Sequence, residues 1–243
     1  MRLLLIVILT ASGIAAPQAS RVPVLLELFT SEGCSSCPPA DRLLESLDRQ
    51  PVGNAEIIVL SEHVDYWNYL GWRDPYSSAF FSDRQHTYSE RLAAAVYTPQ
   101  LVIDGQFQVV GSDQAEVMRT IRRAAGNAKI PISIQATRAG SGGTIHVEAN
   151  GGGAKADLYI ALAGDQARSQ VLRGENGGHV LTHVAVARSI TRIGKWEGSG
   201  AATRDVAISA KQLGGGAPGE TRVIAILQDP ASGRILGAAQ TRI

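Results

Sequence analysis

The two cysteines of the chain, Cys34 and Cys37, constrain its fold more than any other feature. They lie three positions apart, so a disulfide between them cannot tie distant segments together, and a hydrophobic core must hold the fold. With 44% hydrophobic and 19% charged residues, the 243 residues supply such a core and exclude a disordered chain or a small disulfide-stapled scaffold. The formal net charge of +1 provides no basic footprint, so we expect no nucleic-acid partner.

The first twenty residues have the pattern of a secretory signal peptide. Arg2 precedes the apolar run Leu3–Leu9, and small residues follow before residue 21. The run is shorter than the roughly 20 residues that a membrane-spanning helix needs, so we expect no stable membrane insertion once residues 1–20 are removed. The mature protein is therefore predicted to be periplasmic or secreted. Such compartments are oxidising, so a cycling dithiol there needs a chemical reason to exist.

Residues 21–128 alternate strand and helix patterns, with an aromatic-rich insertion between them. The apolar spacing at 40–47 predicts a helix that begins just after the cysteines. We expect strands at 22–29, 57–60, 101–103 and 107–110, an insertion with helices at about 61–96, and a final helix that Ser112 caps and Gly126 ends. This order predicts an α/β domain with a mixed sheet flanked by helices.

Residues 129–243 show no convincing helix pattern. Short strand patterns recur along this half and are separated by Gly-rich turns, which predicts an all-β, sandwich-like second domain. One polar turn, at 173–179, is interpreted as a chain reversal that could touch the first domain.

The position of the cysteines between a predicted strand and helix favours redox chemistry. Backbone N–H groups and the helix dipole at such a junction stabilise a thiolate at Cys34, the candidate nucleophile. Cys37 follows one helical turn later and is placed to resolve a mixed disulfide on Cys34. Two alternatives stay open at this point: a pair of metal ligands, or a static local disulfide.

The run Tyr97–Gly105, followed by Gly111–Asp113, resembles the proline, hairpin and capped helix of glutaredoxins. The resemblance implies a thioredoxin-like fold in which Pro99 forms a cis peptide bond and faces the dithiol. It also implies that the exposed backbone of Thr98 pairs with an extended substrate peptide, with Tyr97 beside it. The alternative is an ordinary proline at the edge of a strand.

Longer motifs in both halves resemble a bacterial family of secreted thioredoxin-like proteins of unknown function, domain-of-unknown-function family 1223. These motifs are Glu27–Asp41, His63–Trp67 with Leu70–Trp72, Tyr97–Gln100 and Gly174–Gly177. The resemblance implies the fold and the secretion, but it carries no assigned reaction. Gly33 and the pair Ser35-Ser36 depart from thioredoxin itself, so no redox potential is carried over.

Glu27 interrupts an otherwise apolar strand seven positions before Cys34. Thioredoxins carry a buried acid near this place, so the resemblance implies that Glu27 is a general base for Cys37. Burial would raise the pKa of this carboxyl, as that role requires. An outward-facing strand glutamate is the alternative.

Polar and aromatic residues follow the predicted strand at 57–60, at the sheet edge where α/β proteins place their sites. We expect His63 and Asp65 to tune the thiolate or to assist proton transfer. Tyr66, Trp67 and Trp72 are predicted to form an apolar docking surface for substrate. A small core inside the insertion would explain the same aromatic residues.

The sequence therefore predicts a thiol–disulfide oxidoreductase-like protein whose partner is a cysteine-containing protein or a small thiol. No nucleotide-binding or flavin motif is visible, so no cofactor besides the Cys34–Cys37 disulfide is expected. Cys34, Cys37 and His63 also form a soft-metal set, which keeps copper or zinc handling as an alternative. A binding module with a structural disulfide is the other alternative.

Overall fold

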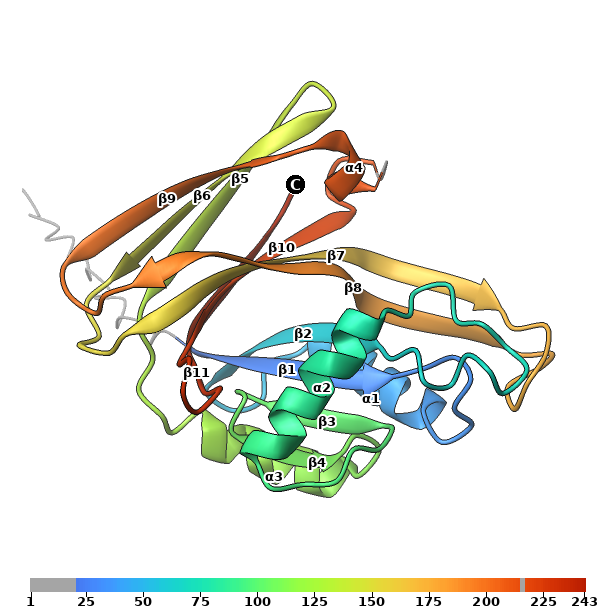
Figure 1. The fold of residues 1–243 in the computed structure, drawn as a ribbon. Helices are drawn as coiled ribbons and strands as arrows, with labels where there is room; N and C mark the ends of the chain where they lie inside the picture. The colour runs from blue at the N-terminus through green and yellow to red at the C-terminus, as the bar shows by residue number, and fades with distance from the viewer. Residues whose placement is uncertain (1–20, 215–216) are drawn as a thin grey trace, which may run out of the picture.

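The computed structural model describes residues 21–214 and 217–243, which form two β-sheets and four helices (Figure 1). In chain order the elements are β1 (Val22–Thr30), α1 (Pro38–Asp48), β2 (Ala55–His63), α2 (Ala79–Arg91), β3 (Gln100–Ile103), β4 (Phe107–Val110), α3 (Gln114–Ala124), β5 (Ile132–Ala139), β6 (Gly142–Asn150), β7 (Ala156–Gln170), β8 (Val180–Trp196), β9 (Ala201–Ile208), α4 (Ala210–Leu213), β10 (Thr221–Gln228) and β11 (Ile235–Arg242). The predicted signal peptide at 1–20 lies outside the described residues. None of the described helices is long and apolar enough to cross a membrane.

Strand β1 lies inside the larger sheet, parallel to β2 and antiparallel to β3. Its residues from Val24 onward are buried, which explains why its sequence is almost continuously apolar rather than alternating. Successive side chains of a strand point to opposite faces. Thr30 accordingly bonds Asp41 of α1, whereas Glu27 bonds Arg84 of α2, which crosses the other face in Figure 1. The expected mixed sheet with helices is confirmed.

The predicted hairpin at Asp104-Gly105 joins β3 and β4. Both turn residues have positive φ, 53° and 60°, a conformation that asparagine, aspartate and glycine adopt more easily than other residues. The following helix starts one residue later than expected. Asp113, not Ser112, is its N-cap and accepts a hydrogen bond from the Glu116 N–H at 3.0 Å.

The larger sheet continues into the second half of the chain. Its strand order is β11-β10-β7-β8-β2-β1-β3-β4, so four strands of the second half extend the sheet of the first. Strand β8 joins β2 where Ser61 lies opposite Val186, and the Ser61 hydroxyl donates to the Val184 carbonyl at 2.7 Å. This differs from the expected separate sandwich at 129–243. Without β8, β2 would be an edge strand with unpaired backbone N–H and carbonyl groups, and pairing with β8 satisfies them. Local sequence patterns do not report a pairing between strands so far apart in the chain.

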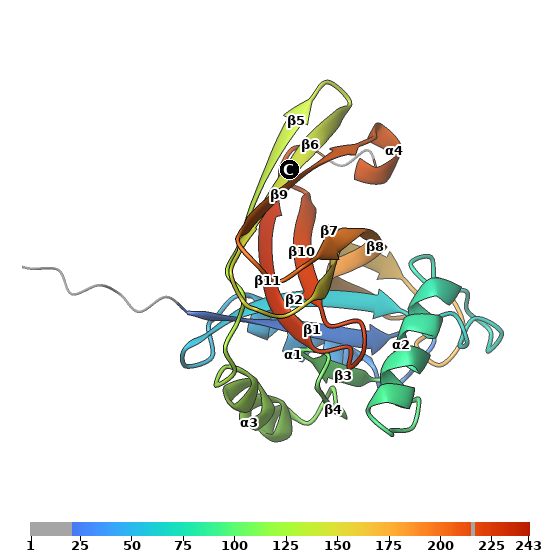
Figure 2. The same ribbon diagram turned by 60° about the vertical axis from the view of Figure 1, so that its left-hand side comes forward.

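A second, antiparallel sheet of β5, β6 and β9 packs beside β10 and β11 (Figure 2). Strand β10 serves two hydrophobic cores because its side chains alternate. Val223, Ala225 and Leu227 face the smaller sheet, whereas Ile224 and Ile226 join the core shared with β1 and α1. Only the short α4 adds helix to this half among the described residues.

Candidate disulfide site

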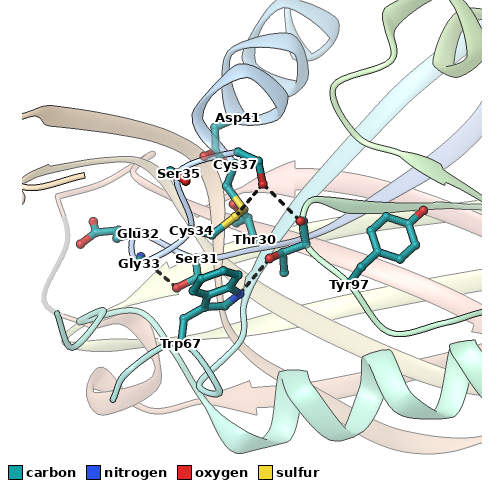
Figure 3. Close-up of a disulfide and its surroundings, with 12 residues drawn as sticks. Thr30, Ser31, Glu32, Gly33, Cys34, Ser35, Cys37, Asp41, Trp67 and Tyr97 are labelled. Atoms are coloured by element: carbon teal, nitrogen blue, oxygen red, sulfur yellow. Dashed lines mark hydrogen bonds between the residues drawn. A yellow bond between two sulfur atoms is a disulfide. The ribbon is translucent and has the colours of Figure 1, made fainter. Parts of the chain in front are cut away.

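Cys34 and Cys37 form a disulfide in the loop between β1 and α1 (Figure 3). Cys37 is the N-cap residue of α1, and Pro38 fits the first turn because it needs no N–H there. Both cysteines are 0% exposed, whereas Ser35 and Ser36 between them are exposed. The disulfide is therefore covered in this state, and a reagent can reach it only if neighbouring groups move.

The loop that contains Pro99 lies against the disulfide loop. The Thr98–Pro99 peptide bond is cis, as the glutaredoxin resemblance implied. The Ser36 hydroxyl lies 3.3 Å from the Cys34 Sγ and 3.4 Å from the Thr98 carbonyl oxygen, to which it donates. Tyr97 points away and donates from its hydroxyl to Gln108 at 2.5 Å. The structure thus brings the Thr98 carbonyl, which belongs to the cis peptide bond to Pro99, to the disulfide loop and leaves Tyr97 at its side.

Trp67 covers the disulfide loop from the insertion. Its indole N–H donates to the Thr98 hydroxyl at 2.8 Å, and its Cβ would lie 3.1 Å from any Cβ added at Gly33. This close approach explains why a glycine precedes Cys34 here. Trp72 donates to the Glu32 carboxylate at 2.8 Å, so it also belongs to the site.

Tyr66 of the predicted docking surface and Asp65, which was expected to tune the thiolate, both turn toward α2. Tyr66 donates to the Gln85 side chain at 3.0 Å, and burial raises its pKa to about 12. Asp65 accepts a hydrogen bond from the Ser82 hydroxyl at 2.6 Å. These two side chains hold the insertion on α2, as the alternative interpretation of a small local core supposed.

A turn from the second half also covers the disulfide. The Asn176 side-chain amide donates to the carbonyl oxygens of Glu32 and Cys34, each at 2.9 Å. The neighbouring Glu175 carboxylate accepts the Ser35 N–H at 3.0 Å. The turn at 173–179 was expected only to reverse the chain and to touch the first half, and it does more than that. It forms part of the disulfide's cover, which no local sequence signal indicated.

Glu27 is buried on the face of β1 that packs on α2. Its carboxylate accepts two hydrogen bonds from Arg84, at 2.8 and 2.5 Å, and one from Tyr88 at 2.6 Å. Burial, and then the proximity of Glu27, raise the pKa of the neighbouring Glu62 carboxyl well above its usual range, while Arg84 counteracts them. The structure therefore places Glu27 in an ion pair across the sheet from α1, not beside Cys37.

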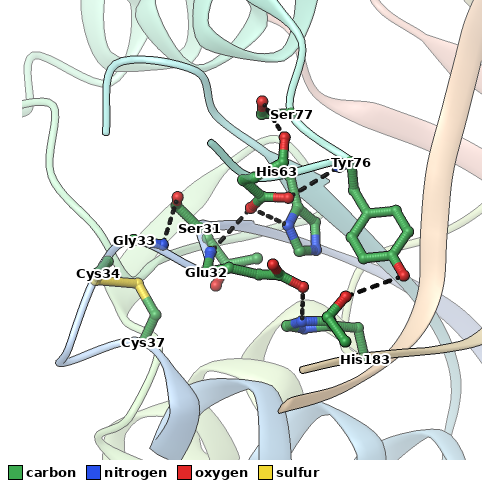
Figure 4. A network of polar contacts seen from close by, with 12 residues as sticks. Ser31, Glu32, Gly33, Cys34, Cys37, His63, Tyr76, Ser77 and His183 are labelled. Atoms are coloured by element: carbon green, nitrogen blue, oxygen red, sulfur yellow. Dashed lines mark hydrogen bonds and ion pairs between the residues drawn. A yellow bond between two sulfur atoms is a disulfide. The ribbon is translucent and has the colours of Figure 1, made fainter. Parts of the chain in front are cut away.

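A buried cluster of acids and imidazoles lies directly behind the disulfide loop (Figure 4). The His63 Nδ1 lies 2.7 Å from the Asp74 carboxylate, which also accepts the Glu32 N–H at 2.8 Å. The ring of His183, from β8, packs edge-on against His63 with centroids 4.6 Å apart. Of this group the sequence suggested only His63 as a site residue; Asp74 lies 11 positions after it, whereas His183 comes from the second half of the chain.

His183 lies between two carboxylates. Its Nε2 is 3.4 Å from Glu32 Oε1, and its Nδ1 is 3.7 Å from Asp41 Oδ1. Burial alone would lower the pKa of His183, but Asp41 and Glu32 outweigh it and raise the pKa to about 9. For the Asp74 carboxyl, burial acts in the opposite direction and would raise the pKa, but His63 and two backbone N–H groups hold it below its usual value. The cluster thus holds His183 between two carboxylates and His63 against a third.

The stability of the protein is expected to fall as the pH rises from about 6.5 to about 9, because of His183. The folded state binds this proton more tightly than the unfolded state, so the stabilisation is complete below pH 6.5 and is lost as the pH passes the folded pKa of about 9. Its size is about 3 kcal/mol at most, from 1.36 kcal/mol per pKa unit. Urea unfolding at both ends of this range measures it.

The matched control is His183→Gln, which removes the titrating group and keeps a polar side chain of similar size. The free energy of unfolding of this variant is expected to change less between the two pH values than that of the wild type. An equal change in both proteins would show that His183 does not carry the effect.

The structure does not assemble the soft-metal set. Among residues 21–214 and 217–243, no group of three or more His, Cys, Asp or Glu side chains is arranged to hold a metal ion. Cys34 and Cys37 bond each other, and His63 is directed to Asp74 and His183 instead. The alternative of metal binding by Cys34, Cys37 and His63 is therefore not supported by their positions.

The fold and the site define a mixed α/β protein with a covered disulfide between a central strand and a helix. The chain belongs to the family described as "Protein of unknown function (DUF1223)", whose model matches residues 25–228. The match spans both halves of the chain and confirms the membership of this family of unknown function that the motifs indicated.

Two solved structures share this architecture. Protein AGR_C_4864 from Agrobacterium tumefaciens is 27% identical, with a TM-score of 0.69, over 92% of this chain and 95% of that one. HBP35 of Porphyromonas gingivalis is 16% identical, with a TM-score of 0.58, over 93% of this chain and 76% of that one, and shows a likeness of fold alone. No curated protein matches the chain.

Proposed function

We propose that the chain is a thioredoxin-like protein of the periplasm or the extracellular space that exchanges disulfides with a cysteine-containing protein or a small thiol. One observation carries the proposal: the Cys34–Cys37 disulfide precedes α1 and touches the cis Thr98–Pro99 loop through Ser36. A purely structural staple has no need of a second loop whose backbone faces it. A substrate peptide that pairs with Thr98 would replace the Ser36 contact.

The exchange begins when a partner thiolate attacks the Cys34 Sγ. The Cys34–Cys37 bond breaks, its electron pair leaves on the Cys37 sulfur, and the partner is joined to Cys34. A second partner thiolate then attacks the partner's own sulfur, which forms the partner disulfide and leaves the two cysteines reduced. In the opposite direction, Cys37 attacks a mixed disulfide on Cys34 and releases the reduced partner.

Asp41 is the group that we propose to exchange the Cys37 proton. It lies one turn after Cys37 on α1, its N–H donates to the Cys37 carbonyl at 3.1 Å, and its side chain is buried. Residues four apart share a helix face, so the carboxylate and the thiol lie on the same side. The thiol proton passes to this carboxylate when Cys37 attacks and returns when Cys37 leaves. Asp41 takes the role first given to Glu27, which Arg84 binds on the other face.

A structural disulfide in a binding module is the second candidate. The observation that favours it is the burial of both cysteines. The same experiment separates the two functions, because a staple has no need to be reduced at biological potentials.

Equilibration of the metal-free mature protein in glutathione buffers is the test. We expect the disulfide to be reduced and reoxidised at a defined potential, within the span of about −120 to −270 mV that oxidoreductases cover. Free thiols are trapped by alkylation and counted by mass spectrometry. Because the disulfide is covered, the same ratio must be reached from the oxidised and the reduced protein. A pair that stays oxidised throughout this span contradicts the proposal.

A further inference from the structure

The exposed carboxylate of Glu175 is fixed beside the disulfide. Its Oε2 accepts the N–H of Ser35, the residue next to Cys34, from 140 positions along the chain. Hydrogen bonding from the Ser35 side chain, and then from the Ser35 N–H, lowers the pKa of Glu175, so the side chain carries its charge at neutral pH. Among the residues that the structure describes, no ion pair neutralises this charge.

The turn that carries Glu175 is anchored on both sides. Asn176 is buried and holds the carbonyl oxygens of Glu32 and Cys34. Gly174 has a positive φ of 76°, and an added Cβ there would lie 3.2 Å from the Cβ of Trp72. Only a glycine lets the turn approach this closely, so the Glu175 charge is held in place rather than free to swing into solvent.

The other acid of the loop does not share this exposure. Glu32 is buried and is engaged by Trp72 and His183. Arg173, two residues before Glu175, is exposed and is the nearest cation in the sequence. An incoming partner therefore meets one fixed negative charge at the cysteine it must attack, and Arg173 is the only arginine or lysine of the turn.

We propose that Glu175 is a specificity-determining residue that selects cationic thiols, meaning a small thiol or a peptide cysteine with a positive charge next to its sulfur. This inference rests on the proposed function and names its substrate class. Each thiolate attacks the Cys34 Sγ, and the electron pair of the broken bond leaves on Cys37, so the chemistry is the same for all thiols. Glu175 changes only the local concentration and orientation of the attacking group.

The test compares three small thiols: cysteamine, neutral 2-mercaptoethanol and 3-mercaptopropionate. The second-order rate constant of each thiol with the oxidised protein is measured at low ionic strength and expressed per thiolate. It is then divided by the rate constant of the same thiol with hydroxyethyl disulfide, which carries no charge. We expect cysteamine to exceed 3-mercaptopropionate by about tenfold, which is typical of one charge pair near a surface. Added salt should reduce the ratio, because it screens exposed charges.

Glu175→Gln removes the charge and keeps an oxygen that can accept the Ser35 N–H. The ratio should then fall to near one, whatever the change in absolute rates. Glu197→Gln, in the residue that follows the far end of β8, is the control for lost surface charge and should keep the wild-type ratio. Arg173→Gln should increase the ratio, because it removes the opposing charge.

The outcomes separate the two proposals. Equal ratios in the wild type and in Glu175→Gln overturn the assignment of the preference to Glu175 and leave the proposed function standing, since exchange itself still occurs. A disulfide that reacts with none of the three thiols overturns the proposed function and the preference together.

Discussion

The Cys37→Ala variant, treated with oxidised glutathione, is expected to accumulate a mixed disulfide between Cys34 and glutathione. In the wild type, Cys37 attacks this bond from the same loop and releases glutathione. An intramolecular attack of this kind has a very high effective concentration, so its loss should lengthen the life of the mixed disulfide by about a hundredfold or more. Mass spectrometry of the acid-quenched protein measures the adduct over time.

Cys34→Ala is the matched control, because it also leaves a single thiol. Cys37 is the N-cap residue of α1, behind the exposed Ser35 and Ser36, so it should form the adduct far more slowly. Equal adduct formation on both variants would contradict the assignment of Cys34 as nucleophile. Absence of an adduct on either variant would favour the structural disulfide.

Replacing Arg84 by methionine is expected to lower the free energy of unfolding by about 3–5 kcal/mol, the usual cost of leaving a buried charge without its partner. Arg84 is the cation between two buried carboxylates, 2.5 Å from Glu27 and 3.6 Å from Glu62. Methionine fills much of the same space but leaves both acids uncompensated. Urea unfolding monitored by circular dichroism gives the difference.

The double variant Arg84→Met/Glu27→Gln is the control for this prediction. It removes one of the two acids with the cation, so it should recover part of the lost stability. Glu27→Gln alone should leave the pH profile of disulfide exchange unchanged if Glu27 is a structural residue. A loss below about 1 kcal/mol in Arg84→Met, the level of exposed ion pairs, would show that the buried pair contributes little.

Local patterns in the sequence predicted the elements around the disulfide well. The strand β1, the helix after Cys37 and the Asp104-Gly105 hairpin depend on periodicity and turn chemistry within about ten residues, and all are present. The joining of β8 to β2 depends on residues 61 and 186, so no local pattern reports it. The second half therefore differs from the expected separate sandwich in that four of its strands extend the first sheet.

The same distinction separates the predicted from the missed residues of the site. Cys34, Cys37 and Thr98 belong to short motifs; the cysteines bond each other and the Thr98 carbonyl accepts from Ser36 between them. Asp41 could have been found, because its spacing places it on the helix face of Cys37. His183 could not, since it reaches the site from the second half of the chain. Asn176 belongs to the family motif at 174–177, but its contact with the Cys34 carbonyl could not be foreseen from that motif. The role of a buried acid such as Glu27, as a general base or as a member of an ion pair, cannot be assigned until its partner, 57 residues away, is known.

The side chains of β10 alternate between two hydrophobic cores, and this affects how cooperatively the two halves of the chain unfold. A strand that contributes every second side chain to each core cannot detach from one while remaining folded in the other. The halves of the chain should therefore unfold in one transition rather than as independent modules. The turn at 173–179 connects β7 to β8, and β7 pairs with β10, so the cover of the disulfide is linked to that same transition. Substitutions in the distant three-stranded sheet would then alter how often the disulfide is uncovered, without touching it.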